Sequence, residues 1–258
     1  MKKITFDKLQ MFFGMPYVVD IEGVKGVITI TQPTLRLLVE FGEKRFYSNL
    51  NPFVSNTTTH RLPLWEAGVD WNEITNFDLF CILYQSVEDE FAEMIFGEGF
   101  SFSSFELYEK SYDEENKEVV LYSKELDVEI NAEVYDHISQ YLQSVFKIFP
   151  EEKNTKDATL KRWFIQKDER ELEIQRKKEA KGEIESPSIL PLISACLNHS
   201  GFKYNSKQIL DINIYEFYDS VQRLQLYESA TAVMKGMFSG FVDTSKIKPD
   251  EYNFMKDI

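Results

Sequence analysis

The sequence has few of the residues and motifs on which most catalytic and metal sites are built. It holds two cysteines and three histidines in 258 residues. The histidines, His60, His137 and His199, lie far apart without the spacing of metal ligands, and the eleven glycines form neither a dinucleotide-binding nor a P-loop pattern. No nucleophile-elbow motif occurs either. The sequence therefore predicts no enzyme, with no catalytic residue, no metal and no cofactor.

Long apolar runs are also missing. No stretch approaches the ~18 apolar residues of a membrane helix, and the first ten residues lack the apolar region of a signal peptide. Cys81 and Cys196 stand in apolar helical patterns, which predicts buried free thiols and a reducing compartment. Because 43% of the residues are hydrophobic, including 21 Phe and 13 Tyr, the chain can build a sizeable core. We expect a globular protein that does not bind membranes.

The net charge of −14 is unevenly placed. Residues 1–150 hold 12 Lys and Arg against 25 Asp and Glu, residues 151–185 hold 10 against 10, and residues 186–258 hold 7 against 8. Such an acidic region repels phosphate backbones, so we expect no nucleic-acid partner. A helix-turn-helix interpretation of residues 206–236 is disfavoured as well, because its second helix opens with the aromatic and acidic sequence IYEFYDS. An acidic surface suits solubility, or a basic or apolar protein partner.

The acidic pairs do not form a recognisable metal loop. The densest cluster is Glu88-Asp89-Glu90, which lacks the glycine and the spacing of a calcium-binding loop. Carboxylates in turns are commonly solvated, and carboxylates in the first turn of a helix interact favourably with the positive end of the helix dipole. We therefore interpret this cluster as a helix start.

Changes in pattern divide the chain into three parts. Residues 1–150 are predicted to form an acidic α+β domain, residues 151–185 a charged helical linker, and residues 186–258 an all-helical C-terminal domain. The helix within the linker is expected to end at Gly182. The predicted fold class is α+β and predominantly α-helical, with a small β element in the N-terminal part. The β elements expected are a strand at 27–31 and a hairpin within 104–130 that has its turn at 113–116. Helices with both bounds are expected at 33–50, 63–68, 132–149 and 189–198. Further helices are expected to begin at Thr75 with Asp78 in its cap, after Asn205, at Asn213 with Glu216 in its cap, and at 248.

Three segments carry a resemblance to a known family. These are QPTLRLLVEFGE at 32–43, the helix Tyr215–Gln225, and the closing SKIKPDEYNFMKDI. Together with the order of the other elements, they resemble the tail assembly chaperones encoded near the tail genes of phages of Gram-positive bacteria. The resemblance extends over most of the chain.

The resemblance implies a non-catalytic assembly helper in the cytoplasm of the infected bacterial host. Such a helper binds the long helical tape measure protein, or another tail protein, and keeps it soluble until the tail tube assembles. Two alternatives stay open: a structural tail or baseplate component of the virion, and a host-takeover effector that binds a host protein. The oligomeric state is also open, with a homo-oligomer among the possibilities. The expected partner-binding residues are Met234, Met237, Phe238, Phe241, Phe254 and Met255, although a Met and Phe set at these spacings is more often plain core than a binding surface.

Overall fold

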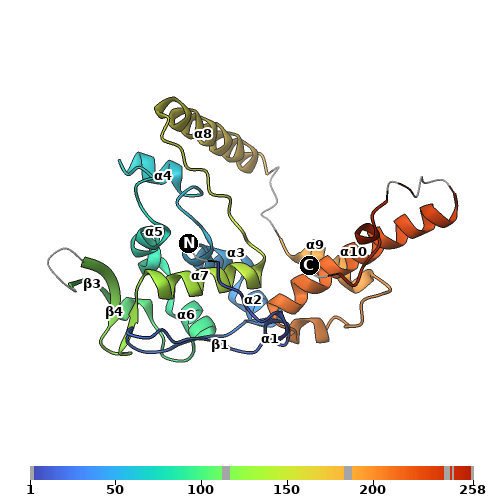
Figure 1. The fold of residues 1–258 in the computed structure, drawn as a ribbon, viewed down its shortest axis with the longest axis horizontal. Coiled ribbons are helices and arrows are strands. Elements are labelled where there is room, and N and C mark those ends of the chain that lie inside the picture. Colours follow the sequence, from blue (N-terminus) through green and yellow to red (C-terminus); the bar gives the residue numbers. More distant parts are fainter. Residues whose placement is uncertain (1–2, 112–116, 183–187, 241–244, 246, 257–258) are drawn as a thin grey trace.

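The chain folds mainly into helices that surround one large apolar cluster (Figure 1). The computed structural model describes residues 3–111, 117–182, 188–240, 245 and 247–256. Because 55% of the chain is helical and 10% is strand, the predicted α+β, predominantly helical class is confirmed. The α-helices are α1 Lys8–Phe12, α2 Leu35–Phe41, α3 Glu43–Val54, α4 Arg61–Glu66, α5 Asn76–Leu83, α6 Asp89–Phe96, α7 Ala132–Phe146, α8 Ala158–Ala180, α9 Leu190–Asn198 and α10 Ile214–Phe238. Short 3-10 helices are η1 Tyr84–Ser86, η2 Phe102–Ser104, η3 Gln208–Asp211 and η5 Pro249–Glu251.

The strands form two small antiparallel sheets. Strands β1 (Tyr17–Val19) and β2 (Ile28–Ile30) pair with each other. Strands β3 (Phe105–Ser111), β4 (Lys117–Ser123) and β5 (Val128–Ile130) form the second sheet in that order. The predicted hairpin is confirmed as β3–β4, and its expected turn at 113–116 lies outside the described residues.

Local capping chemistry fixes several helix starts. Thr75 accepts a hydrogen bond from the backbone N–H of Asp78, whose carboxylate accepts the N–H of Thr75 in return, so the predicted helix start is confirmed and has the form of a capping box. Asn213 caps α10 by accepting the N–H of Glu216, 2.9 Å away. These starts were predictable because each depends on side chains within one turn of sequence.

Other predicted boundaries were wrong. The single helix expected over 33–50 is two helices, since Gly42 adopts φ +94° and redirects the chain between α2 and α3. The helix expected to begin at Pro63 begins at Arg61. The helix expected to reach 149 ends at Phe146, because Lys147 takes a left-handed conformation.

The main core joins the first elements of the C-terminal region to the N-terminal region. Besides aromatic rings such as Phe80 and Tyr135, 4.8 Å apart between centroids, it includes Ile214 and Phe217 of α10, both fully buried. The backbone N–H of Leu35 bonds the carbonyl of Ile212 at 3.1 Å, which adds a polar connection. The division into domains 1–150, 151–185 and 186–258 stays a prediction. Within the main apolar cluster, residues from the first and the last of these parts pack together.

Helix α8 rests on a second, smaller apolar cluster. Ile165 is its one buried residue within the described chain, and it packs with Trp71 and neighbours from α4 and α5. Arg61 donates hydrogen bonds from Nε and Nη2 to the two carboxylate oxygens of Asp168 on α8. Past this contact α8 continues to Ala180 with its side chains largely exposed, beside α4 in Figure 1.

Candidate protein-binding site

Helix α10 provides the longest partly uncovered surface in the C-terminal region. Its first turns are anchored in the core, but beyond Phe217 its one buried residue among those described is Ala230. In Figure 1 the helix extends away from the main body, with α9 beside it. The sides of α10 contact α9 and residues 247–256, the C-terminal segment, while Val221 and Leu224 also pack against the main apolar cluster.

Two apolar hollows flank α10. The first has a volume of about 230 Å³ and lies between α9 and α10. The second, of about 380 Å³, lies between α10 and the C-terminal segment. Leu224 lines both, and we call the two hollows together the α10 groove. Its apolar lining includes Leu192, Cys196, Val221, Leu224, Tyr227 and Phe254.

A single guanidinium positions the C-terminal segment on α10. Arg223 Nη1 donates to the backbone carbonyl of Phe254 at 2.7 Å and to that of Lys256 at 2.8 Å. The ring of Phe254 stands edge-on to Tyr227, with 5.4 Å between centroids. This contact closes one wall of the second hollow.

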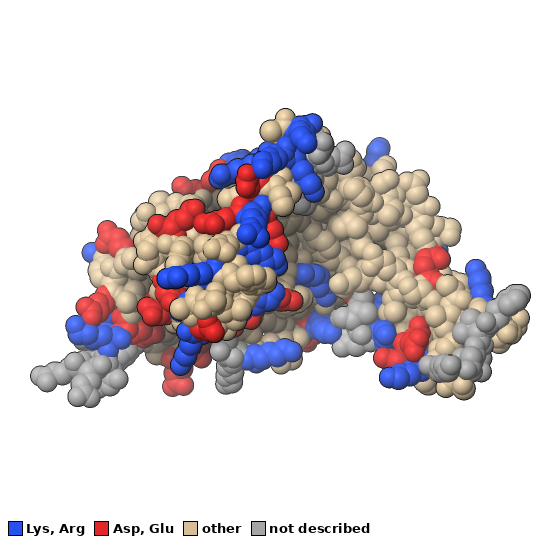
Figure 2. Space-filling view, turned by 90° about the horizontal axis from the view of Figure 1, so that it is seen from above, with Lys and Arg blue, Asp and Glu red and all other residues tan. Residues whose placement is uncertain are grey.

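A polar pair marks the rim of the first hollow. The backbone N–H of Gly201 donates to His199 Nδ1 at 2.9 Å, so the Nε2 position carries the proton and donates to Glu228 Oε1 at 2.8 Å. Figure 2 shows few charged side chains over the α9–α10 half of the visible face, whereas the other half mixes both signs densely. An apolar groove with a thin polar rim is the usual character of a helix-binding surface.

The structure gathers only part of the residue set expected from the sequence. Phe254 and Met255 line the second hollow, and the Met255 side chain is 79% exposed. Met234 and Met237 are half-buried near the end of α10, where Phe238 is 91% exposed, away from the residues that line the groove. Phe241 lies outside the described residues.

Sequence reasoning missed the centre of the groove. Val221 and Leu224 are spaced like a helical face and are joined by Leu192 and Cys196 from α9. The spacing on each helix was visible in the sequence. Which face of α9 meets which face of α10 depends on tertiary packing, so the groove itself could not be derived.

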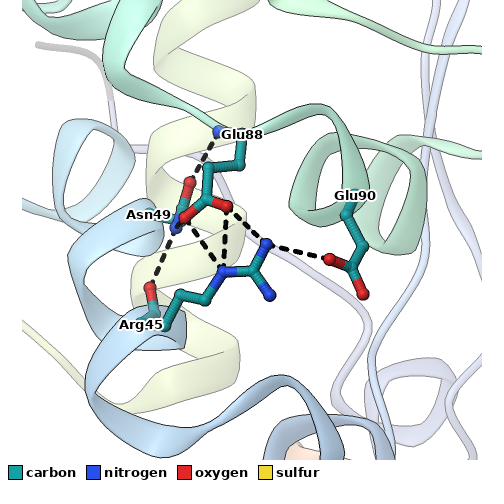
Figure 3. Close-up of polar contacts among 4 residues, drawn as sticks. All are labelled: Arg45, Asn49, Glu88 and Glu90. Atoms are coloured by element: carbon teal, nitrogen blue, oxygen red, sulfur yellow. Dashed lines mark hydrogen bonds and ion pairs between the residues drawn. The ribbon is translucent and has the colours of Figure 1, made fainter.

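The acidic cluster at 88–90 serves a structural junction between α3 and α6 (Figure 3). The carboxylate of Glu88, the N-cap residue of α6, accepts hydrogen bonds from Arg45 Nε at 2.9 Å and from the side-chain amide of Asn49 at 2.9 Å. Arg45 Nη2 also bonds Glu90 Oε2 at 2.9 Å. The Asn49 side chain accepts the N–H of Glu88 at 2.6 Å. The expected helix start is confirmed, and Arg45 balances its charge.

This junction predicts a defined acid sensitivity. The hydrogen bonds from Arg45 and then Asn49 hold the pKa of Glu88 below its ordinary value. A depressed pKa in the folded state adds stability above the unfolded pKa, about 4.3, and this stability is lost as the pH falls through the folded pKa. We expect Glu88→Gln to be less stable than the native protein near neutral pH, with the difference shrinking between about pH 5 and pH 3. Denaturant titrations across this range measure it, and a constant difference would contradict it.

The remaining titratable side chains of interest have ordinary structural partners. Cys81 and Cys196 are free thiols as predicted, Cys196 buried and Cys81 half-buried, and burial raises the pKa of Cys81 to about 12. His60 bonds Ser55 Oγ at 3.0 Å, and His137 Nδ1 lies 2.6 Å from the hydroxyl of Tyr17. Within the described residues no three His, Cys, Asp or Glu side chains gather as a metal site.

None of the described helices combines the length and the apolar character that crossing a bilayer requires.

Comparison with known proteins gives one match. Residues 177–258 match the family model described as the YomV second domain, a family of phage origin. No curated protein and no solved structure matches the chain. The matched range begins inside α8 and contains all the residues that line the α10 groove. Less than half of the chain is matched, and this C-terminal part is similar to a phage domain family, which supports a phage protein.

Proposed function

We propose that the chain is a non-catalytic phage tail assembly chaperone, which binds the tape measure protein or another tail protein in the cytoplasm of the infected bacterium. The observation that carries the proposal is the α10 groove, which lies within the part similar to a phage family. The tail-specific step comes from the resemblance of segments 32–43, 215–225 and 245–258 to tail assembly chaperones.

The groove has the properties that such a partner requires. An unassembled tape measure protein exposes apolar helix faces, and a groove between two helices accepts such a face by contacts at i, i+3 and i+4. The exposed thioether of Met255 adapts to different apolar side chains. The excess of acid in residues 1–150, 25 against 12, would keep the complex soluble.

The test is a pull-down from phage-infected cells with the tagged protein, together with mass spectrometry of purified particles. We expect recovery of a long helical tail protein, with this chain absent from particles. Stoichiometric presence in particles would favour the structural alternative instead, and recovery of host proteins alone would favour the effector alternative.

A groove variant makes the experiment specific. Tyr227→Asp combined with Met255→Asp places two charges in the second hollow, and both side chains are exposed enough, at 43% and 79%, for the fold to tolerate the change. Recovery of the tail protein should fall by about tenfold or more, as for central interface residues. Leu107→Asp, on strand β3 and 51% exposed, is the matched control and should leave recovery unchanged. Equal recovery with all variants would remove the groove from the proposal.

A further inference from the structure

The C-terminal segment, residues 247–256, lies on the outside of α10. Helix α10 ends at Phe238, and the segment comes back to contact Arg223 in the first half of the helix (Figure 1). Every residue from 247 to 256 is half-buried or exposed, and none is buried. By contrast, Ile214 in the first turn of α10 is 0% exposed. The segment is therefore a surface layer on α10 and not part of the core.

The segment is attached to α10 at one place. Among the described residues, its hydrogen bonds to the rest of the chain both come from Arg223 Nη1, at 2.7 Å to the carbonyl of Phe254 and at 2.8 Å to that of Lys256. Its one aromatic contact there is the ring of Phe254 against Tyr227. Because Arg223 and Tyr227 are one helical turn apart, these attachments share a small area of the helix surface.

The other described hydrogen bonds of the segment are internal. The N–H of Glu251 bonds the carbonyl of Lys248 at 2.9 Å, and Lys256 Nζ bonds the carbonyl of Asp250 at 3.0 Å. None of these bonds involves α10. The segment can therefore leave the helix as a unit, and its release breaks only the contacts at Arg223 and Tyr227.

The second hollow separates the segment from α10. Its volume of about 380 Å³ falls within the range of small-molecule sites, about 300–1,000 Å³. Leu224 and Tyr227 line it from α10, and Phe254 and Met255 line it from the segment. Surfaces packed as densely as a protein interior leave few voids larger than a water molecule. The segment thus covers a space beside α10 instead of filling it.

These contacts favour a closed position that opens reversibly. Elements with few buried apolar contacts open locally at a much smaller free-energy cost than global unfolding, because little burial offsets the entropy of ordering each residue. Hydrogen bonds from a guanidinium are stronger than neutral ones, so Arg223 favours the closed position. Removal of this one charged donor should therefore shift the balance toward the open position.

We propose that the C-terminal segment is a strap, which opens from α10 when the contacts at Arg223 and Tyr227 break, admits an apolar helix to the second hollow, and closes over it. The identity of the helix that enters rests on the function proposed above, whereas the opening of the strap does not. Because Arg223 bonds main-chain carbonyls, the same two hydrogen bonds can re-form after each opening.

The first test measures opening in the purified full-length chain. Spin labels at Lys235→Cys on α10 and Met255→Cys on the strap, both exposed positions, report their separation by pulsed electron paramagnetic resonance. Cys81 and Cys196 should react little, because burial raises the pKa of both thiols. We expect a closed and a longer, open distance, with the ratio of open to closed rising about tenfold or more in Arg223→Met.

Arg176→Met, which removes an exposed arginine from α8, is the matched control and should leave the distances unchanged. A single distance that Arg223→Met does not alter would overturn the strap, since packing alone would then hold the segment in place.

The second test locks the strap. A short bismaleimide cross-linker joins Tyr227→Cys to Phe254→Cys, where the native rings are in contact, and the control is the same variant treated with N-ethylmaleimide. Recovery of the tail protein should be about tenfold lower or less with the cross-linked chain. Equal recovery would overturn the opening step. If neither the native chain nor the variant recovers a tail protein, the proposed function fails, and the spin-label distances still decide whether the strap opens.

Discussion

Phe217→Ala is expected to lower the free energy of unfolding by about 3–5 kcal/mol, the usual loss for a large buried ring. Phe217 is 0% exposed, and it belongs to the main apolar cluster although it lies on α10 in the C-terminal region. The cavity would form where α10 enters the core shared with the N-terminal elements, so the whole shared core should lose stability rather than α10 alone.

Urea denaturation followed by both far-ultraviolet circular dichroism and tyrosine and tryptophan fluorescence measures this effect. Tyr227→Ala, on the same helix but 43% exposed, is the control and should cost about 1 kcal/mol or less. If both variants lost equally little, α10 would not be packed in the main core. Two separate transitions in the native protein would instead support independent domains of the predicted kind.

Arg61→Met is expected to cost about 3 kcal/mol, because it leaves the carboxylate of Asp168 without its partner. The side chains of Arg61 and Asp168 are 11% and 21% exposed, and the guanidinium also lies 4.7 Å from the ring centroid of Phe164. This ion pair joins α4 to α8, so its loss should free α8 from the second apolar cluster. Hydrogen exchange of the α8 amides should accelerate more than that of α7.

A double variant distinguishes the ion pair from simple packing. In Arg61→Met with Asp168→Leu, no unpaired charge is left, and most of the lost stability should return. The exposed pair Lys177 and Glu173 is the matched control: Lys177→Met should change stability by about 0.5 kcal/mol or less. A double variant as unstable as Arg61→Met alone would show that the charge pair is not what holds α8.

The parts of the fold that were predictable from the sequence are those encoded within a few residues. The capping residues Thr75 and Asn213 and the β3–β4 hairpin depend on neighbours along the chain, and their positions were predicted. The break at Gly42 was missed because apolar residues on both sides of it continue a helical pattern. Strand β1 was missed because three residues carry too little pattern, and its partner β2 defines it.

The candidate sites were less predictable than the fold. Phe254 and Met255 were expected as contact residues from their composition, but Leu224, which lines both hollows, looked like an ordinary core position. The hollow bounded by the N-terminal residues, the end of α7 and α10 brings together Lys3 and Lys147, which are remote in sequence. Such groupings arise from the packing of separate elements, and a single sequence contains no local signal for them.

Arg223 attaches the C-terminal segment to α10 through the segment's backbone, whereas the side chains of the segment line the second hollow. Its guanidinium donates hydrogen bonds to the main-chain carbonyls of Phe254 and Lys256, and these two hydrogen bonds do not involve the side chains at those positions. These backbone hydrogen bonds can therefore form with other side chains at positions 254 and 255, and the exposed Met255 is the position least bound by side-chain packing. If the proposed tail partner changes in sequence, substitutions at these two positions could follow it without a change at Arg223.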